Sequence, residues 1–526
     1  MVKYMDNNSG FRQWNAARDA AQPKSRWGGI LWWFILFLAS WWLLSWWLAP
    51  TTPATSDTNS AATEHADLTN VPVYEIKSDN LTADVQGLRI SNIELLKYAA
   101  DPSDKENTAP ITLLGTDGAF AEIGMVAVGT TAPTAETVWR VNGDEYNWRN
   151  PDGIEFTRKI TTDGYIISVA DTVHNASDSE ITVAPYGRIV RANDMASSAG
   201  VYSGSVAFVN SDLEHEDWAR LADNKSFAYT TSGGFVGFVD QYWETILSVD
   251  SADQTMRIKP LGTLFQADTA AAAISVAPGA EHTITTNLYM GPRDQQILSG
   301  ADAVIPGLDE TVDYGWFWFF VQPILWLLNI LNSFVMNYGV AIIIMTLLLR
   351  LAMWPLTRKS YVSMMAMQKM QPEMMRIQKL YANDKARLQI EMMRLYQTHK
   401  TSPMSGCLPM LIQIPIFFAL YKALLISVQM RSAQFLWISD LASMDPYFIL
   451  PILMGATMWL QQYLQTPSTA GTSNNDAVAQ TQKVMKWMPL IFTVMFAWMP
   501  AGLVLYWTIS NIFGIGQMYY IKRLKK

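Results

Sequence analysis

Hydrophobic residues gather in two regions of the chain, near its start and over its last two hundred residues, with a long polar block between them. The segment Trp27–Leu48 is predominantly apolar over 22 residues, which is enough to cross about 30 Å of hydrocarbon as a helix. Further apolar segments follow the polar block. We therefore predict a polytopic α-helical membrane protein with six spans, at residues 27–49, 335–357, 404–428, 445–465, 485–499 and 502–521.

The polar block alternates between apolar and polar residues over many short runs. Examples are Gly164–Ala170, Ser203–Asn210 and His282–Met290. Alternation with a period of two over many short segments is typical of half-buried strands in an antiparallel β-sandwich. We therefore predict a large all-β domain over residues 70–312, attached by a flexible linker at 50–69 that is rich in Ser, Thr, Ala and Pro.

The aromatic segment 313–334 has two possible interpretations. It is apolar enough to be a transmembrane helix, but Pro323 interrupts it, and too few polar residues follow to form a loop before the next span. A Trp-rich amphipathic helix can instead lie in the membrane interface. We favour an interfacial amphipathic helix for this segment.

Charge is distributed unevenly along the chain, whose formal net charge is −8. Between Pro50 and Val312 there are 37 acidic residues against 15 Lys and Arg, so the remainder of the chain is basic. Cytoplasmic segments of membrane proteins are enriched in Lys and Arg. We therefore place the acidic domain and the loop 429–444 outside. The segments that we place in the cytoplasm are the N-terminal tail 1–26, the segment 358–403, the polar loop 466–484 and the basic tail 522–526.

The cytoplasmic segment 358–403 is predicted to form a hairpin of two helices, Lys359–Tyr381 and Asp384–His399, with Asp384 placed to cap the second. Methionine-rich helical surfaces are adaptable and suit the binding of varied partners. We predict that this hairpin receives substrate through Met364, Met365, Met374, Met375, Met392 and Met393. The alternative is that these methionines hold the two helices together.

The segment Tyr338–Leu356 carries one full charge, Arg350, inside its apolar run. Charged side chains are costly in hydrocarbon, and those that occur there usually serve function. Thr346 lies one helical turn before Arg350 on the same face, and Trp354 lies one turn after it. Alternatively, Arg350 extends to the cytoplasmic headgroups, since about 9 Å of helix separates it from the basic segment. The segment alone favours neither interpretation.

Polar residues also occur in other spans, with Gln413 in the third and Trp507, Ser510 and Asn511 in the last. Such side chains usually face a bundle interior or a water-filled cavity. Ordinary hydrogen bonds between helices would explain the isolated Ser, Asn and Gln equally well. They do not explain Arg350, which has no acidic residue in any span to pair with. We predict a hydrophilic substrate groove lined by Arg350, Thr346, Gln413, Trp507, Ser510 and Asn511.

Other functional classes have weaker support in the sequence. The one cysteine, Cys407, excludes an internal disulfide; the four histidines of the polar block are scattered, and no GxxxxGK phosphate loop occurs. We predict no metal site, no cofactor and no enzymatic activity. Two alternatives stay open, namely a membrane-anchored carbohydrate-binding protein or enzyme, and a secondary transporter, although a transporter would usually show internal repeats.

Four motifs resemble the YidC family of membrane-protein insertases, in the long form of Gram-negative bacteria within the YidC/Oxa/Alb superfamily. The resemblance covers residues 315–521, and the first anchor and outer domain match in layout. Trp507 stands where tyrosine is common, and Lys422 stands where some relatives have an uncharged residue. The motifs are TLLLRLAMWPLT at 346–357, GCLPMLIQIPIFFALY at 406–421, DPYFILPILMG at 445–455 and AGLVLYW at 501–507.

The resemblance implies a five-helix core whose hydrophilic groove is open to the cytoplasm and to lipid, with Arg350 as its arginine. It also implies a periplasmic β-supersandwich, a location in the bacterial inner membrane and no use of nucleotide. The expected partners are nascent membrane proteins, the Sec translocon, and the ribosome or targeting factors. In the implied mechanism Arg350 attracts acidic groups of a hydrophilic tail, and the hydrophobic segment then leaves sideways into lipid.

Overall fold

The computed structural model describes residues 66–101, 109–116, 118–193, 201–223, 225–382, 384–399, 408–431, 433–465 and 487–524. The predicted tail 1–26, the anchor 27–49, most of the linker 50–69 and the loop 466–484 lie outside the described residues. The end of the predicted hairpin segment, the start of the predicted span 404–428 and the last two residues also lie outside them.

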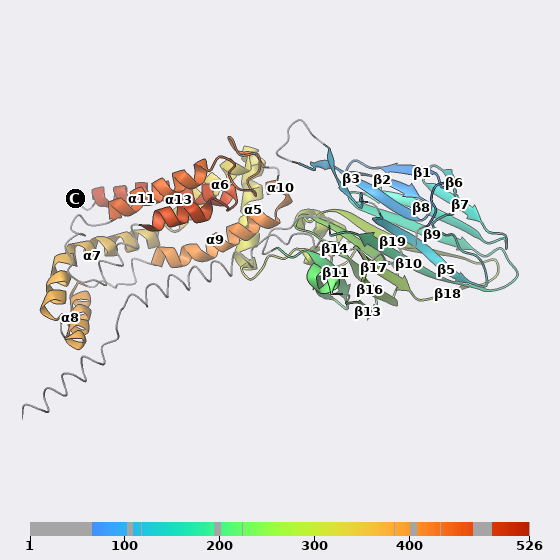
Figure 1. Cartoon of the computed structure of the whole chain (residues 1–526), viewed down its shortest axis with the longest axis horizontal. Helices are drawn as coiled ribbons and strands as arrows, with labels where there is room; N and C mark the ends of the chain where they lie inside the picture. The colour runs from blue at the N-terminus through green and yellow to red at the C-terminus, as the bar shows by residue number, and fades with distance from the viewer. Residues whose placement is uncertain are drawn as a thin grey trace, which may run out of the picture. The chain divides into compact units, whose positions relative to one another are not determined.

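The polar block folds into a β-sandwich, which confirms the prediction from alternation (Figure 1). All pairings between its strands are antiparallel among the described residues. The strands are β1 (Val73–Lys77), β2 (Leu81–Gln86), β3 (Arg89–Ala99), β4 (Pro110–Leu113), β5 (Phe120–Val128), β6 (Arg140–Asn142), β7 (Glu145–Arg149), β8 (Glu155–Asp163), β9 (Ile166–His174), β10 (Ile181–Arg191), β11 (Gly204–Val209), β12 (Asp212–Asp217), β13 (Phe227–Thr231), β14 (Phe235–Val239), β15 (Trp243–Val249), β16 (Gln254–Leu261), β17 (Leu264–Ala271), β18 (Ile274–Val276) and β19 (Glu281–Pro292).

These strands form two sheets. The first has the order β1-β2-β3-β5-β10-β17-β16-β13, with β4 paired to β3 and β18 paired to β10. The second has the order β12-β11-β14-β15-β19-β9-β8-β7-β6. The three runs chosen from the sequence as examples of alternation correspond to β9, β11 and β19. Strands that are distant in sequence are therefore neighbours, and side chains far apart in the chain meet on one face.

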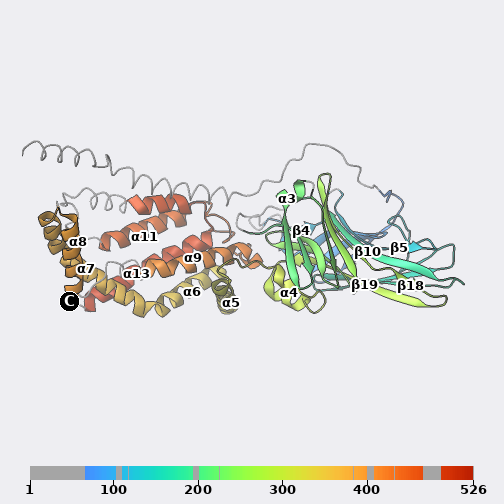
Figure 2. The same ribbon diagram turned by 90° about the horizontal axis from the view of Figure 1, so that it is seen from below.

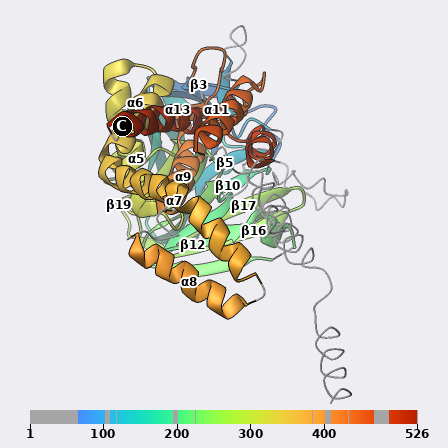
Figure 3. The ribbon, with the colours of Figure 1, turned by 90° about the vertical axis from the view of Figure 1, so that its left-hand side faces the viewer.

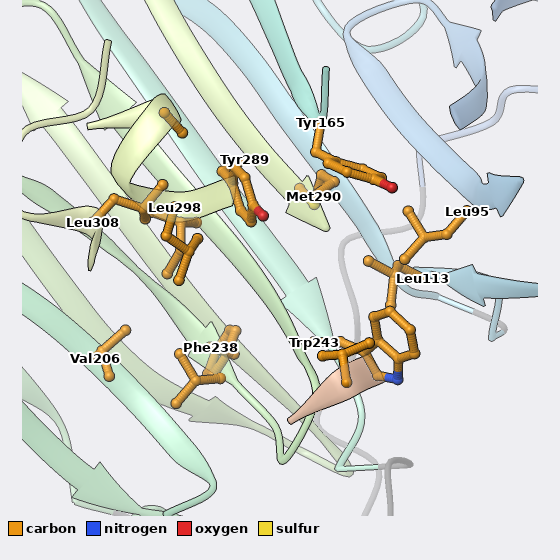
Figure 4. Close-up of a cluster of buried hydrophobic side chains, with 14 of the residues drawn as sticks. Leu95, Leu113, Tyr165, Val206, Phe238, Trp243, Tyr289, Met290, Leu298 and Leu308 are labelled. Carbon is orange, nitrogen blue, oxygen red and sulfur yellow. The ribbon is translucent and has the colours of Figure 1, made fainter. Parts of the chain in front are cut away.

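Between the sheets lies a continuous apolar core, part of which is drawn in Figure 4. Phe238, Trp243 and Tyr289 are all buried there. The short helices α3 (Trp218–Ala222) and α4 (Gln295–Ala301) and the 3-10 helix η1 (Leu308–Thr311) accompany the strands. Leu298 of α4 and Leu308 of η1 are fully buried in this core. Burying apolar area of this extent is the main favourable contribution to folding.

Buried charges in the sandwich are paired. The Arg158 guanidinium donates to both carboxylate oxygens of Asp171, at 2.7 and 2.8 Å, and to the Ile123 carbonyl at 2.6 Å. Arg191 donates to Asp240 at 2.8 Å. A charge can be removed from water at tolerable cost when it is paired and hydrogen-bonded in this way.

Glu244 of β15 and Arg293, which follows β19, are exceptions, because both are buried without an ion pair among the described residues. The Arg293 guanidinium donates instead to the backbone carbonyls of Thr311, Tyr202 and Asp240. Burial raises the pKa of Glu244 to about 8 despite the nearby Arg293. The Thr311 hydroxyl lies 2.8 Å from Glu244 Oε2 and 2.8 Å from the Leu308 carbonyl, but it has one hydrogen to donate. A protonated Glu244 resolves this geometry, because it donates to Thr311 while Thr311 donates to Leu308.

The remaining described residues are mostly helical (Figures 1 and 2). Helix α13 packs against α6, α7, α9 and α11, and α5 packs against α6 and α9. The stretch Trp487–Phe496 forms a further short apolar helix. The bounds are α5 (Trp318–Val335), α6 (Tyr338–Ala352), α7 (Trp354–Leu380), α8 (Lys385–Thr398), α9 (Leu408–Ile426), α10 (Val428–Arg431), α11 (Ile449–Gln465) and α13 (Ala501–Leu524).

Length and hydropathy make α5 a candidate membrane span among the described residues, and α6 with the first part of α7 is a second, bent one. Shorter apolar helices occur at Gln413–Ile426 and Trp487–Phe496. The count of six spans therefore stays a prediction. Helix α5 also includes Pro323 in its interior rather than breaking there, and its interfacial position stays a prediction.

The predicted span around Arg350 is divided between two helices. Helix α6 ends at Ala352, α7 begins at Trp354, and the two are bent by 64° at this break. Pro355 lies in the first turn of α7. Proline is tolerated in a first helical turn but removes a hydrogen bond from a helix interior, so it favours a new helix start at this point. Apolar composition alone does not reveal such a break.

Helices α7 and α8 form the predicted hairpin (Figure 3). The Asp384 side chain accepts a hydrogen bond from the Arg387 backbone N–H at 3.0 Å, which confirms the predicted cap. Helix α7 begins five residues earlier than the predicted helix at Lys359. The hairpin is therefore continuous with the helix that follows Arg350.

Candidate functional site

Arg350 lies in the last turn of α6 and is held by a neutral side chain of α13. Its Nε donates to Ser510 Oγ at 2.7 Å, and its NH2 donates to the same oxygen. Ser510 is buried, and Arg350 is half-buried. The sequence placed these two residues in one candidate site, and the structure brings them into direct contact.

Ser510 belongs to a row of residues along one side of α13, which we call the α13 polar stripe: Tyr506, Ser510, Gly514 and Gln517. Spacings of four, four and three residues place them on one helix face. The phenol of Tyr506 accepts from the Gln413 side chain of α9, and the Gly514 carbonyl accepts from Tyr361 of α7 at 3.3 Å. Gln517 donates to the Arg350 backbone carbonyl at 3.4 Å. The stripe thus joins α6, α7 and α9 through polar contacts.

Gly514 makes room for one of these contacts. A Cβ at this position would lie 3.3 Å from the Gln461 amide nitrogen and 3.5 Å from the Tyr361 hydroxyl. A larger side chain would fill the space in which polar groups of α7 and α11 meet α13.

Arg350 has no ion-pair partner among the described residues. The ionisable groups that interact with it are the phenols of Tyr506 and Tyr361. An arginine cannot lose its proton in a protein. The site therefore retains a full positive charge, whose guanidinium is hydrogen-bonded to one hydroxyl and has two phenols as its ionisable neighbours.

Two other predicted residues take part in different contacts. Thr346 is fully buried, and its hydroxyl donates to the Ile342 carbonyl of its own helix at 2.6 Å. Asn511 is buried and donates to Thr457 of α11 at 3.3 Å. Asn511 therefore joins α13 to α11, from a position about 100° around the helix from Ser510.

Trp507 lies in an aromatic cluster rather than in a polar contact. Its ring lies 5.4 Å from that of Phe417 and 5.1 Å from that of Phe496, both edge-to-face, and 6.0 Å from that of Phe492. Edge-to-face pairs at these separations are favourable. The cluster connects α9, α13 and the helix Trp487–Phe496 next to Gln413 and Tyr506.

The hairpin methionines divide into two groups. Met364 and Met365 pack against a buried cluster formed by Tyr361 of α7 with Met518 and Ile521 of α13. Met393 of α8 is 56% exposed. Met374, Met375 and Met392 are half-buried. The first pair fits the structural interpretation of these methionines, and Met393 offers the most accessible surface of the six.

At the opposite end of α9 from Gln413, Lys422 forms an ion pair. Its Nζ lies 2.8 Å from Asp313 Oδ2, in the segment that precedes α5. Burial raises the pKa of Asp313, but Lys422 outweighs this effect, so the pKa is lowered overall. The charge of Lys422, unlike that of Arg350, is neutralised by a carboxylate.

The sequence did not single out several residues of this site: Tyr506, Tyr361, Thr457, Gly514 and Gln517. The spacing of polar and small residues from 506 to 517 was a usable signal, since it repeats at helical intervals around Ser510. The contributions from α7 and α11 depend on packing between distant segments and had no local signal.

Comparison with known proteins assigns both parts of the chain. Residues 330–526 match the family described as 60Kd inner membrane protein, and residues 74–327 match the family described as YidC periplasmic domain. The chain is 34% identical to the membrane protein insertase YidC of Rickettsia bellii over 507 residues, which cover 88% of this chain and 89% of that protein. It is 34% identical to the membrane protein insertase YidC of Magnetococcus marinus over 469 residues, covering 84% of this chain and 81% of that protein.

Among solved structures, the chain is similar to an active YidC insertase whose first transmembrane domain is resolved. The sequence identity is 18% and the TM-score 0.37, with 86% of this chain and 96% of that chain covered. The identity to the two curated relatives extends across both the β-sandwich and the helical region. The chain therefore belongs to the YidC family of membrane protein insertases.

Proposed function

We propose that this protein inserts nascent membrane proteins into the inner membrane through a hydrophilic groove built along the α13 polar stripe. One observation carries the proposal: Arg350 is bound by Ser510 and by no carboxylate among the described residues. A retained positive charge between apolar helices is costly unless water reaches it. Its natural use is to attract negatively charged groups that have to cross the membrane.

In this mechanism a hydrophilic tail of the substrate enters the groove from the cytoplasm. Arg350 attracts acidic side chains of the tail, while Ser510, Gln413 and Tyr506 offer hydrogen bonds in place of water. Each hydrogen bond retained during crossing lowers the cost of taking polar groups out of bulk water. Thr346, Trp507 and Asn511 complete the predicted groove, Thr346 and Asn511 by supporting its helices and Trp507 by bordering it.

The hydrophobic segment of the substrate then leaves the groove sideways into lipid. Burial of its apolar surface supplies the driving force, so no nucleotide is needed. We propose six spans at the positions predicted from the sequence, with both termini in the cytoplasm. The Sec translocon, and the ribosome or targeting factors, are the proposed partners, and the protein is proposed to act without metal, cofactor or catalysis.

Water access to the groove can be measured with single cysteines in a Cys407→Ser background. Gln413→Cys replaces a side chain that faces Tyr506, so it should react with a membrane-impermeant maleimide in inverted vesicles and react slowly in right-side-out vesicles. The matched control is Ile414→Cys, because Ile414 is the next residue of α9 and is 41% exposed on its surface. In a bilayer that position should face lipid and stay unlabelled.

Equal labelling of Gln413→Cys from both sides would indicate a through-channel and would contradict a groove closed to the outside. Absence of labelling from either side, with the denatured protein labelled normally, would show a dry packed core. In both cases the proposed mechanism would be wrong.

The hairpin of α7 and α8 is proposed to receive substrates before they enter the groove. Its support is the accessible surface around Met393 together with the basic composition of the segment. Deleting residues 360–398 should reduce insertion several-fold, because substrate capture is lost while α6, α9, α11 and α13 retain their mutual contacts. Insertion yield should be compared with protein abundance in the same membranes. Normal insertion at normal abundance would remove the hairpin from the mechanism.

A further inference from the structure

The segment 433–448, which we call the outer loop, joins α10 to α11 and crosses the beginning of α13 (Figure 1). The Leu441 carbonyl accepts from the Gly502 backbone N–H at 2.9 Å, and the Ser443 carbonyl accepts from the Ala501 N–H at 2.7 Å. The first N–H groups of a helix have no partner within the helix itself. The outer loop supplies these partners, so it is fixed across the start of α13.

The outer loop is also attached to the beginning of α6. The Asn337 side chain, which caps α6, donates to the Gln434 carbonyl at 3.1 Å. Phe435 and Ile438 exchange two backbone hydrogen bonds of 2.9 Å, which close a tight turn. A Cβ on Gly339 of α6 would lie 2.2 Å from the Phe435 ring, so the ring rests on this helix where there is no side chain. The loop therefore contacts both helices whose side chains meet at Arg350 and Ser510.

Apolar side chains fill the space beneath the outer loop. Leu441 is 0% exposed and Ile438 is 2% exposed. A Cβ on Gly502 would lie 3.0 Å from a methyl carbon of Leu424 of α9, 3.2 Å from one of Ile342 of α6 and 3.2 Å from the Leu441 carbonyl oxygen. The loop, α6, α9 and α13 thus meet in one closely packed layer.

This layer lies on the side of Arg350 and Ser510 that faces away from the hairpin. Ser510 follows Gly502 by eight residues, which is about 12 Å along α13. Arg350 follows Gly339 by eleven residues, which is roughly 17 Å along α6. Water moving from this end of the helices toward Arg350 would have to cross the layer.

Asp445 holds the outer loop together from within. Its side chain is buried, at 1% exposure, and has no ion pair among the described residues. Oδ1 accepts from the Trp437 indole N–H and from the Tyr447 backbone N–H, both at 3.0 Å. Oδ2 accepts from the Leu450 backbone N–H, in the first turn of α11, at 2.7 Å. Hydrogen bonds to a carboxylate are stronger than neutral ones, and a helix N-terminus favours negative charge.

We propose that the outer loop closes the groove toward the outside and that Asp445 is the positioning residue that keeps it closed. The inference rests on the proposed function, which supplies the groove and its orientation. The bonds of the loop to α13 come from backbone carbonyls and do not depend on side-chain identity. The bonds of Asp445 do, because its carboxylate connects the turn at Trp437 to the start of α11. Without them the turn that carries Phe435 loses its attachment, and water gains a path to Arg350.

The test measures water access from the outside with Gln413→Cys in a Cys407→Ser background. Asp445→Ala should raise the rate of labelling by a membrane-impermeant maleimide in right-side-out vesicles by about tenfold or more, because loss of hydrogen bonds to a buried carboxylate favours the open loop. Labelling in inverted vesicles should stay unchanged. Asp445→Asn should cause a smaller rise, since its carbonyl oxygen can still accept from the two donors that bind Oδ1.

A second variant tests the same contact with less risk to folding. Trp437→Phe keeps an aromatic ring and removes the indole N–H, so outside labelling should rise by about threefold. Tyr447→Ala is the control within the loop, because this side chain is 66% exposed and only its backbone N–H binds Asp445. Asp384→Ala is the control for loss of a helix cap, since Asp384 accepts from the Arg387 N–H in the hairpin. Both controls should leave outside labelling unchanged.

Two results would overturn the inference. One is unchanged outside labelling in both Asp445→Ala and Trp437→Phe at normal protein abundance. The other is an equal rise in Asp445→Ala and Tyr447→Ala, which would show general loosening of the loop. Labelling of Gln413→Cys from the cytoplasm does not depend on Asp445. Its absence would count against the proposed function, while labelling from the outside would still decide whether the outer loop is a barrier.

Discussion

Arg158 of the β-sandwich and Arg350 of the helical region are held by different kinds of partner. In the sandwich, Arg158 faces both oxygens of the Asp171 carboxylate. In the helical region, Arg350 faces the hydroxyl of Ser510. The first arrangement neutralises the charge and fixes the strands. The second positions the guanidinium and leaves its charge without a carboxylate partner among the described residues, which is what the proposed site for acidic groups requires.

The acid Glu244 completes the comparison. It is buried without an ion pair among the described residues, and its raised pKa lets it become neutral. Arg350 does not have this option, because a guanidinium stays protonated. Without a carboxylate, a buried guanidinium needs other acceptors. Arg293 of the sandwich has three backbone carbonyls, whereas the Arg350 guanidinium has the Ser510 hydroxyl among the described residues, which argues for water next to Arg350.

The largest effect should follow from breaking the pair in the sandwich. Asp171→Ala leaves Arg158, whose side chain is 2% exposed, buried without its carboxylate. Removing one partner of a buried ion pair costs about 3–5 kcal/mol. Urea-dependent pulse proteolysis of the full-length protein, with fragments of the β-sandwich resolved on gels, measures the loss.

The control is Arg149→Ala, which removes an ion pair of 3.6 Å whose side chains are 63% and 50% exposed. Exposed pairs of this kind contribute about 0–1 kcal/mol. Equal losses of unfolding free energy in the two variants would show that burial does not distinguish the two ion pairs. The contrast drawn here for Arg158 would then be wrong.

A smaller effect is expected from Glu244, and it depends on pH. Its pKa rises from the usual value near 4.5 to about 8 on folding, so its contribution to stability is fully present below pH 4.5 and is lost as pH rises toward 8. Glu244→Gln mimics the protonated acid and can still donate to Thr311. In the variant, the free energy of unfolding should no longer decline between pH 4.5 and 8. At pH 8 it should be larger than that of the unmodified protein by on the order of a few kcal/mol.

Pulse proteolysis at pH 5, 6.5 and 8 gives the two stability curves. The matched acid is Glu310, an exposed residue of η1, and Glu310→Gln should leave the pH dependence unchanged. Parallel curves for Glu244→Gln and the unmodified protein would mean that Glu244 is charged in the fold.

The smallest free-energy effect should come from Arg350, although it concerns function most directly. Arg350→Lys keeps the charge and loses the planar fork, while Arg350→Ala loses both. A single charge pair in a hydrated groove contributes about 1–4 kcal/mol, so Ala should reduce insertion of substrates with acidic translocated tails by about tenfold or more. Lys should retain much of the activity, and neutral tails should be affected little.

The measurement is an insertion assay with substrates that differ only in tail charge. Equal loss on acidic and neutral tails would show that Arg350 acts by holding α6 against α13 through Ser510. In that case the arginines of the two regions would have the same structural role.

The sequence predicted the architecture where local patterns decide it. Alternation identified the strands, and the cap at Asp384 followed from its residue type and its place before an amphipathic helix. Arg350 and Ser510 could be grouped because polar residues are rare in spans. The break at Met353 could not be predicted in the same way, because the apolar run continues across it and only Pro355 marks the new helix.

Contacts between strands and helices that are distant in the chain could not be predicted from the sequence. Four strand registers place Arg89 and Arg257 on one face of the first sheet, at the two ends of a row that also contains Glu122, Arg188 and Asp268. Gln517 reaches the Arg350 carbonyl because α13 packs against α6. A single sequence contains the residues of such sites but does not specify which registers bring them together.

The break between α6 and α7 has a mechanical consequence. Helix α7 has 27 residues with Pro372 in its interior, so the part before this proline, residues 354–371, is about 27 Å long. A rotation of this part about the break would move its far end by roughly 5 Å for every 10°. The contacts of Gln517 with Arg350 and of Tyr361 with Gly514 lie close to this break between the helices. A small rotation at these contacts would therefore become a shift of several ångströms in the hairpin.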